Sequence, residues 1–280
     1  MPAASDIIRP PSPPAPAGWV GRLRRFHAFV YDLIGVVGRR FASLGDIYYM
    51  PNADGGLYVI RHPDHIREVL VTNAECWAKT HSAFMRLGRV LGQGLLNTDG
   101  EVWRRHRRMI QPAFHQARLQ AYSERMVEEA TDMLGRWHDG RPVDLGHELT
   151  RATLRIVSRA SFSHEVGGDV DAITGAVTVL QDSFAQPDLV PSWLPSPRRR
   201  KVRRALRSID EVMYRLIAAR RHRHASGDVR DSGESVDLLQ RLLDARDEEG
   251  DGAGLSDKEI RDQLVTFFVA GHETTSQALT

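Results

Sequence analysis

The sequence predicts a mostly α-helical fold with one small β-hairpin near the N-terminus, and two observations support this prediction. From residue 62 onward, apolar residues recur every three or four positions, which is the period of an α-helix. Before that point, two short β-rich runs at 46–50 and 56–60 flank the turn residues PNADG, as in a hairpin. The chain has 280 residues, 41% hydrophobic and 26% charged, which is the composition of a globular protein.

The N-terminal segment is rich in proline, and we expect residues 1–20 to form an extended, disordered leader. One domain is predicted over residues 21–280, with its first helix over residues 26–44. The apolar part of this helix is broken by Asp32 and flanked by arginines, whereas a membrane span needs roughly 20 mostly apolar residues. We therefore expect a cytoplasmic protein that has no membrane anchor.

The later helices follow from the same periodicity. Apolar residues fall on one face of predicted helices at 119–137 and 202–217, and a shorter helix is predicted at 237–243. Ser256 and Glu259 have the spacing of a capping box at the start of a last helix. That helix is still apolar where the sequence stops, so we expect the chain to be the N-terminal part of a longer domain.

Charge and cysteine content exclude several classes of protein. Lys and Arg number 38 and Asp and Glu 36, so the formal charge of +2 excludes a polycation that coats nucleic acid. The single cysteine, Cys76, excludes an internal disulfide and a multi-cysteine metal cluster. The basic helix 198–223 could bind nucleic acid or acidic lipid. We interpret it instead as a solvated face balanced by the acidic cluster at 244–249, and we expect no nucleic-acid partner.

The last predicted helix contains the run AGHETT at 270–275. Glycine costs about 1 kcal/mol inside a helix, so Gly271 needs a reason, which is either packing or function. Ala270 and Thr274 are four apart and share a face, where their small size lets a flat group approach the backbone. The Thr274 hydroxyl can bond the carbonyl four residues earlier and so open or bend the helix. Glu273 beside it could supply protons.

A second run, at 94–114, carries a tryptophan and several arginines. Trp103 and Arg107 are four apart on one helix face and offer an indole N–H and a guanidinium. A guanidinium binds carboxylates in bidentate fashion, so this pair suits a ligand with carboxylate groups. The alternative is a basic surface helix that ends at Pro112.

These runs resemble the cytochrome P-450 family of haem-thiolate monooxygenases. The central helix of that family carries the pattern Ala/Gly-Gly-x-Asp/Glu-Thr-Thr/Ser, and residues 270–275 match it at each position. The stretches 94–114 and 237–260 resemble, in the right order, the third helix of the family and the approach to its central helix. The resemblance implies a haem cofactor, dioxygen, a small apolar substrate and a ferredoxin or flavoprotein as electron donor.

The resemblance also implies roles for single residues. Ala270 and Gly271 would line the oxygen groove, Thr274 would steady the iron-bound peroxide and Glu273 would deliver protons. The haem propionates would contact Trp103 and Arg107, with Lys79 as a third contact. The expected walls of the substrate pocket are Met85, Leu95, Leu96 and Phe267.

The iron ligand of the family is a cysteine in a loop beyond the central helix, and this sequence contains no such loop. Cys76 lies far upstream, so no residue of the chain is assigned as a metal ligand, and we expect the chain to be inactive alone. The rival interpretations are a helical binding module that uses the basic helix 198–223 without haem, and a non-functional fragment.

Overall fold

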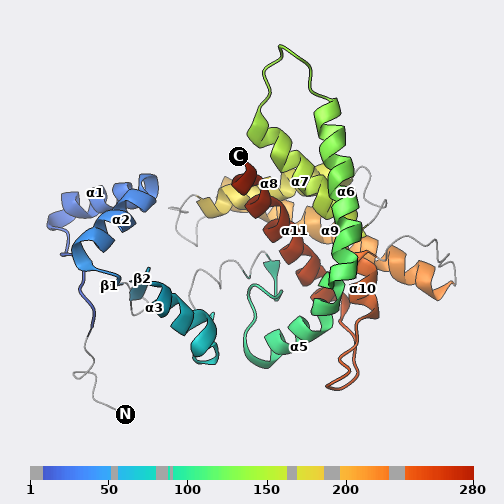
Figure 1. Cartoon of the computed structure of the whole chain (residues 1–280), viewed down its shortest axis with the longest axis horizontal. Helices are drawn as coiled ribbons and strands as arrows, with labels where there is room; N and C mark the ends of the chain where they lie inside the picture. The colour runs from blue at the N-terminus through green and yellow to red at the C-terminus, as the bar shows by residue number, and fades with distance from the viewer. Residues whose placement is uncertain are drawn as a thin grey trace. The chain divides into compact units, whose positions relative to one another are not determined.

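The computed structural model describes residues 9–51, 56–79, 88, 91–162, 169–185, 196–226 and 237–280. The chain divides into two compact units, Met1–Ala78 and Lys79–Thr280. Helices make up most of both units, and one two-stranded sheet lies in the first (Figure 1). The predicted fold class, mostly α with a small hairpin near the N-terminus, is confirmed.

The first unit begins with two helices, α1 (Gly18–Tyr31) and α2 (Leu33–Leu44). The prediction of one continuous helix over 26–44 is wrong. Asp32 leaves the helical conformation, with a φ of −141°, and its carboxylate accepts a hydrogen bond from the Gly35 amide at 3.1 Å. A short acidic side chain competes with helical bonding in this way, so Asp32 ends one helix and caps the next.

The predicted hairpin is confirmed. Strands β1 (Ile47–Met50) and β2 (Leu57–Ile60) are antiparallel, and Tyr48 lies opposite Val59. Tyr48 is fully buried, and its ring centroid lies 5.1 Å from that of Phe41 on α2. The hairpin therefore packs against the second helix through aromatic side chains.

The proline-rich leader is in contact with this unit. The Tyr49 amide donates a hydrogen bond to the Pro11 carbonyl at 2.9 Å, and α1 already begins at Gly18. Part of the segment 1–20 is thus ordered against the hairpin. The boundary predicted between leader and domain stays a prediction.

The first unit ends with three short helical segments, α3 (Pro63–Arg67), the π-helical turn η1 (Glu68–Thr72) and the 3-10 turn η2 (Ala74–Cys76).

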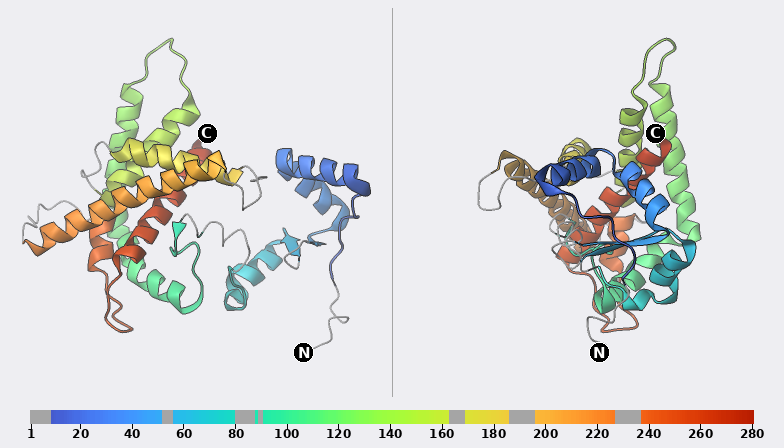
Figure 2. Two further views of the ribbon diagram at one scale, coloured as in Figure 1. Left: turned by 180° about the vertical axis from the view of Figure 1, so that it is seen from behind. Right: turned by 90° about the vertical axis from the view of Figure 1, so that its left-hand side faces the viewer.

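The second unit is helical in the part that the structure describes. Its elements are α5 (Gly100–Ile110), η3 (Gln111–Phe114), α6 (Gln116–Gly135), α7 (Leu145–Phe162), α8 (Asp169–Ala185), α9 (Pro197–Ala225), α10 (Leu238–Asp244) and α11 (Asp257–Leu279). Helix α11 packs against α7 and α9, and α8 lies along α9 (Figures 1 and 2).

Two predictions about these helices are confirmed. The apolar stripe of α9 is buried in the core, as shown by Ala205, Ile209, Val212, Met213, Leu216 and Ile217. The capping box of α11 is complete, since Ser256 caps the Glu259 amide and the Glu259 carboxylate accepts from the Ser256 amide.

Within the described residues, none of the helices is both long enough and apolar enough to cross a membrane. The cytoplasmic location stays a prediction.

Candidate functional site

Helix α11 is continuous through the AGHETT run at 270–275. The Thr274 hydroxyl donates to the Ala270 carbonyl at 2.6 Å, and the Thr275 hydroxyl donates to the Gly271 carbonyl at 2.8 Å. The predicted bond from Thr274 to the carbonyl four residues earlier is confirmed. It is made without interrupting the helix.

The two faces of this run differ in exposure. Ala270 and Thr274 are exposed on one face, and Glu273 is half-buried beside them. A Cβ added to Gly271 would lie 3.1 Å from Cγ2 of Val157 on α7. The missing side chain of Gly271 therefore eases the contact between α7 and α11, and its role beside the oxygen groove stays a prediction.

The residue between Gly271 and Glu273 is buried. His272 is 2% exposed, and its Nδ1 lies 2.7 Å from the Phe268 carbonyl oxygen one turn earlier. The Thr153 hydroxyl of α7 lies 3.3 Å from the His272 carbonyl oxygen. The face of α11 opposite Ala270 and Thr274 is thus held against α7.

Helix α5 carries the predicted propionate contacts. Trp103 is 37% exposed, and Arg107, one turn later, is exposed. The Lys79 ammonium lies 5.9 Å from the Trp103 ring centroid, and it donates to the carbonyls of Leu95 at 3.1 Å and Thr98 at 3.0 Å. The structure therefore places Lys79 beside Trp103, although Lys79 is already hydrogen-bonded, and the propionate roles of both residues stay predictions.

The other arginines of α5 each form an ion pair: Arg104 with Glu101, Arg105 with Glu259 and Arg108 with Asp247. In the described part of the chain, no carboxylate pairs with Arg107. This difference singles out the Arg107 guanidinium as the α5 cation that is open to a ligand.

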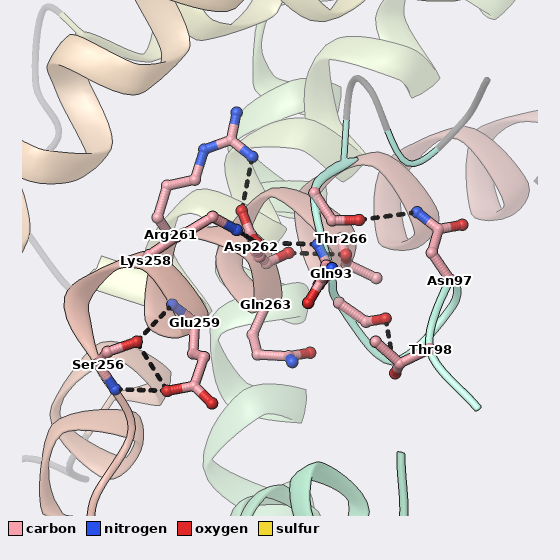
Figure 3. A network of polar contacts seen from close by, with 12 residues as sticks. Gln93, Asn97, Thr98, Ser256, Lys258, Glu259, Arg261, Asp262, Gln263 and Thr266 are labelled. Atoms are coloured by element: carbon pink, nitrogen blue, oxygen red, sulfur yellow. Dashed lines mark hydrogen bonds and ion pairs between the residues drawn. The ribbon is translucent and has the colours of Figure 1, made fainter. Parts of the chain in front are cut away.

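The loop 92–98, which precedes α5, is bonded to the first half of α11 (Figure 3). The Gln93 amide donates to the Asp262 carboxylate at 2.8 Å, and the Leu95 amide donates to Gln263 Oε1 at 3.1 Å. Both acceptors are buried, at 2% and 0% exposure. The loop that carries Leu95 and Leu96, two of the predicted pocket residues, is therefore fixed to α11 by backbone amides.

Two glycines allow this close approach. Gly92 has a φ of +73°, and a Cβ at this position would overlap the Asp262 carboxylate. A Cβ on Gly94 would overlap the Thr266 hydroxyl. Only glycine fits both the left-handed backbone at Gly92 and the space beside α11.

The same network continues to α5. Gln263 Nε2 lies 3.1 Å from His106 Nδ1, and His106 Nε2 lies 3.1 Å from Glu259 Oε1. Burial raises the pKa of Glu259, but hydrogen bonds from Ser256 and His106, together with the charge of Arg105, outweigh it and lower the pKa to about 2. Glu259 is therefore a stable carboxylate at neutral pH.

Sequence reasoning found Glu259 only as a helix cap and missed Asp262, Gln263 and His106. The sequence contained a signal for them, because Asp262 and Gln263 interrupt the apolar positions of α11. The structure shows that both residues are buried. Buried polar groups need partners, so polar residues inside an apolar helical pattern predict long-range hydrogen bonds.

The predicted pocket walls are only partly brought together. Leu95 packs against the core, whereas Leu96 is 41% exposed. The Phe267 ring lies 5.4 Å from the Phe114 ring, centroid to centroid. Met85 lies outside the described residues.

A groove of about 470 Å³ lies elsewhere, between the end of α5, α10 and the turn that follows α10. Its lining combines apolar residues such as Met109 and Leu242 with charged residues such as Arg108 and Asp247. Leu95, Leu96 and Phe267 are not among the residues that line it, so this groove is not the predicted pocket.

Among the described ion pairs, two acids of the cluster at 244–249 pair with α5, whereas the prediction paired the cluster with the basic helix. Asp247 lies 3.0 Å from Arg108 and 3.6 Å from Arg105, and Glu249 lies 3.4 Å from Arg108. These acids neutralise α5 rather than α9. The prediction is wrong because pairing depends on which elements are adjacent in space, and sequence charge counts do not contain that information.

Cys76, the single cysteine of the chain, is exposed and lies in the first unit. Among the residues described, no group of three or more His, Cys, Asp and Glu side chains is arranged to hold a metal ion.

Comparison with known proteins identifies the class of protein that these features define. A family model described as Cytochrome P-450 matches residues 10–280. The chain therefore belongs to the cytochrome P-450 family, as the resemblance predicted.

Two bacterial relatives illustrate the similarity. Pentalenene oxygenase of Streptomyces avermitilis is 35% identical over 240 residues, which cover 84% of this chain and 51% of that protein. Cyclooctatin synthase of Streptomyces melanosporofaciens is 32% identical over 241 residues, which cover 84% and 50%. The chain thus spans about half the length of these relatives.

The fold is similar to that of a solved family member. The crystal structure of the haem domain of a cytochrome P-450DA mutant superposes with a TM-score of 0.76 at 26% sequence identity. The match covers 96% of this chain and 58% of that one.

Proposed function

We propose that this chain supplies the propionate-binding helix and the oxygen-side helix of a haem-dependent monooxygenase. The reaction inserts one oxygen atom of dioxygen into a small apolar organic substrate. The observation that carries the proposal is on α5, where Trp103 lies one turn from Arg107. Among the described residues, Arg107 has no carboxylate partner, while the other arginines of α5 are neutralised.

The described residues fit the edge and one face of a haem. The Arg107 guanidinium and the Trp103 indole N–H are donors suited to carboxylates. Lys79 lies beside Trp103, with its ammonium 3.9 Å from the Asp99 carboxylate. On α11, the small exposed side chain of Ala270 permits close approach of a flat macrocycle. When bound, haem supplies the iron that activates dioxygen.

The sequence does not provide the iron ligand that the family uses. The family ligand is a cysteine thiolate, and the one cysteine of this sequence, Cys76, is exposed in the first unit, away from any glycine-rich loop. We therefore propose that residues 1–280 alone do not hydroxylate a substrate. The activity belongs to a protein that also provides the thiolate.

Two residues of α11 are suited to proton handling. Because the Thr274 hydroxyl gives its hydrogen to the Ala270 carbonyl, its oxygen can accept a hydrogen bond on the exposed face. Glu273 is half-buried next to it and can hold or release a proton. We assign Thr274 to orienting a ligand on this face and Glu273 to supplying protons.

The substrate class and the electron donor are proposed by analogy with the family. Pentalenene oxygenase is named for oxygenation of pentalenene, and by analogy we propose an apolar substrate here. Leu95, Leu96 and Phe267 would form its walls. A ferredoxin or flavoprotein would deliver the electrons.

The proposal is tested by titrating the 280-residue chain with haem and following the absorbance. Arg107→Ala should weaken haem binding by about 10- to 100-fold, because a hydrogen bond to a charged group contributes about 1.5–3 kcal/mol. Arg104→Ala is the matched control on the same helix, and it should change the affinity by less than about threefold because that pair is exposed. Equal losses in the two variants would contradict the assignment of Arg107.

The missing thiolate is tested separately with carbon monoxide. The reduced carbon monoxide complex of the haem-loaded chain should lack the red-shifted thiolate band, and Cys76→Ala should leave the spectrum unchanged. A thiolate band that disappears in Cys76→Ala would make Cys76 the ligand and overturn the proposed inactivity.

A further inference from the structure

We propose that Gln263 and His106 are a positioning pair, which ties the loop 92–98 to α5 and α11. In each of their hydrogen bonds, one partner is fixed as the donor and the other as the acceptor. Gln263 is 0% exposed and His106 is 1% exposed, so water does not compete for their polar atoms. The direction of each bond follows from the chemistry of the groups at the two ends.

The direction is set first by the Leu95 amide. A backbone N–H can only donate, so the atom of Gln263 that faces it at 3.1 Å must be the carbonyl oxygen Oε1. This fixes the orientation of the side-chain amide, which the positions of heavy atoms alone leave ambiguous. The NH₂ group of Gln263 therefore faces His106.

The proton of the imidazole is then placed. The Gln263 NH₂ group can only donate, so His106 Nδ1, at 3.1 Å, must be the acceptor and carry no proton. The single ring proton sits on Nε2, which donates to Glu259 Oε1 at 3.1 Å. Glu259 is a dependable acceptor because its pKa is lowered to about 2.

The neighbouring charges do not change this assignment. Arg105 is bonded to the Glu259 carboxylate at 2.9 Å and lies 3.6 Å from Asp247, which faces it from the turn after α10. Asp262, the next acid of α11, accepts from the Gln93 amide and from Lys258 at 2.7 Å. The contacts recorded for the His106 ring nitrogens are with Gln263 and Glu259.

The three bonds depend on one another. If the ring proton moved to Nδ1, the Gln263 amide would have to turn over, and the Leu95 amide would then lose its acceptor. Because His106 adjoins Arg107, the pair couples the loop to the helix that carries the propionate contacts. Only the role of Leu95 as a pocket wall rests on the proposed function; the bond directions do not.

The wild-type chain provides the first test, through nitrogen NMR of ¹⁵N-histidine at pH 7.5. We expect His106 Nδ1 to have the shift of an unprotonated nitrogen and Nε2 that of a protonated one. His272 is an internal reference of opposite pattern, because its Nδ1 faces a carbonyl oxygen and must be protonated. His106→Gln identifies the resonances. A protonated Nδ1 on His106 would overturn the proposal.

Two variants of Gln263 separate its donor from its acceptor. Gln263→Glu keeps an acceptor for the Leu95 amide but offers no donor to His106, so Nδ1 should become protonated while Leu95 stays protected from hydrogen exchange. Gln263→Met removes the acceptor, and the Leu95 amide should exchange about tenfold faster.

The Gln93 amide is the control, since it is bonded to Asp262 in the same loop and should keep its exchange rate in Gln263→Met. An unprotonated Nδ1 in Gln263→Glu, or equal acceleration at Gln93 and Leu95 in Gln263→Met, would refute the pair. These measurements need no haem, so failure of the proposed function would leave them unaffected.

Discussion

The two halves of α11 hold their polar side chains in different ways. In the first half, residues 257–268, Glu259, Asp262 and Gln263 are bonded to α5 and to the loop 92–98. In the second half, residues 269–279, the hydroxyls bond to carbonyls of the same helix: Thr274 to Ala270, Thr275 to Gly271 and Ser276 to Glu273.

This difference indicates a division of roles along one helix. A buried polar group whose partner belongs to another segment fixes the distance between the two segments. A hydroxyl that bonds to its own helix fixes no distance to another segment. Of the three, Thr274 and Thr275 are exposed, whereas Ser276 is buried. The first half of α11 is thus an anchor, and the second half leaves Ala270 and Thr274 exposed on the face where we propose that a ligand binds.

The largest effect on the free energy of unfolding is expected at Gly92, where the loop 92–98 lies against Asp262 of the anchor. Gly92→Ala should lower the free energy of unfolding by about 3 kcal/mol, because it combines an unfavourable positive φ with overlap against Asp262. Gly100→Ala is the matched control, since Gly100 also has a positive φ, +59°, but has open space around it. Urea denaturation of both variants measures the difference, and equal losses would show that overlap with α11 contributes nothing.

The next effect concerns the charge at Glu259. Glu259→Gln should lower the free energy of unfolding at pH 7 by about 1–2 kcal/mol, because charge-assisted bonds to His106, Arg105 and Ser256 are weakened. Glu101→Gln, in an exposed pair, should cost less than about 0.5 kcal/mol.

The same residue predicts a pH dependence with a definite sign. The folded-state pKa of Glu259 is about 2, below its ordinary value of 4.5, so its contribution is complete above pH 4.5 and is lost as the pH falls through 2. The stability difference between wild type and Glu259→Gln should therefore shrink between pH 5 and 2. A difference that is constant over this range would mean that the charge is not what stabilises the anchor.

A smaller effect is expected from hydroxyls in the two halves. Thr274→Val removes a bond within the helix on an exposed face and should change the free energy of unfolding by less than about 0.5 kcal/mol. Thr266→Val removes the same kind of bond at a buried position beside Gly94 and should cost about 1 kcal/mol. Equal costs in thermal unfolding would remove the distinction between the halves.

The smallest effect is expected at Gly271 in the second half. Gly271→Ala should gain about 1 kcal/mol from helix propensity, offset by a methyl group close to Val157, so the net change should be near zero. A loss as large as that of Gly92→Ala in the same denaturation experiment would show that α7 anchors the second half as firmly as the loop anchors the first.

Local patterns in the sequence were sufficient to predict several secondary-structure elements and the hydrogen bond within the 270–275 motif. The hairpin, the apolar stripe of α9, the capping box at Ser256 and the Thr274 back-bond each depend on residues close together in the chain. The break at Asp32 was not predicted, because a single acidic residue inside an apolar run does not show whether the helix ends there.

The anchor could not be predicted in the same way. His106 and Gln263 are 157 positions apart, and Asp247 is 139 positions from Arg108. Periodicity shows that a polar residue is buried but does not identify its partner. The wrong pairing of the acidic cluster with the basic helix has the same cause.

Hydrogen exchange along α11, recorded residue by residue on the 280-residue chain with and without added haem, tests the division of the helix most directly. Amides of residues 260–268 should exchange slowly in both samples, because their segment is buried and bonded to the loop and α5. Amides of residues 270–275 should exchange at least about tenfold more slowly when haem is present. Unchanged exchange in residues 270–275, or haem-dependent protection confined to residues 260–268, would contradict the assignment of the second half as the ligand face.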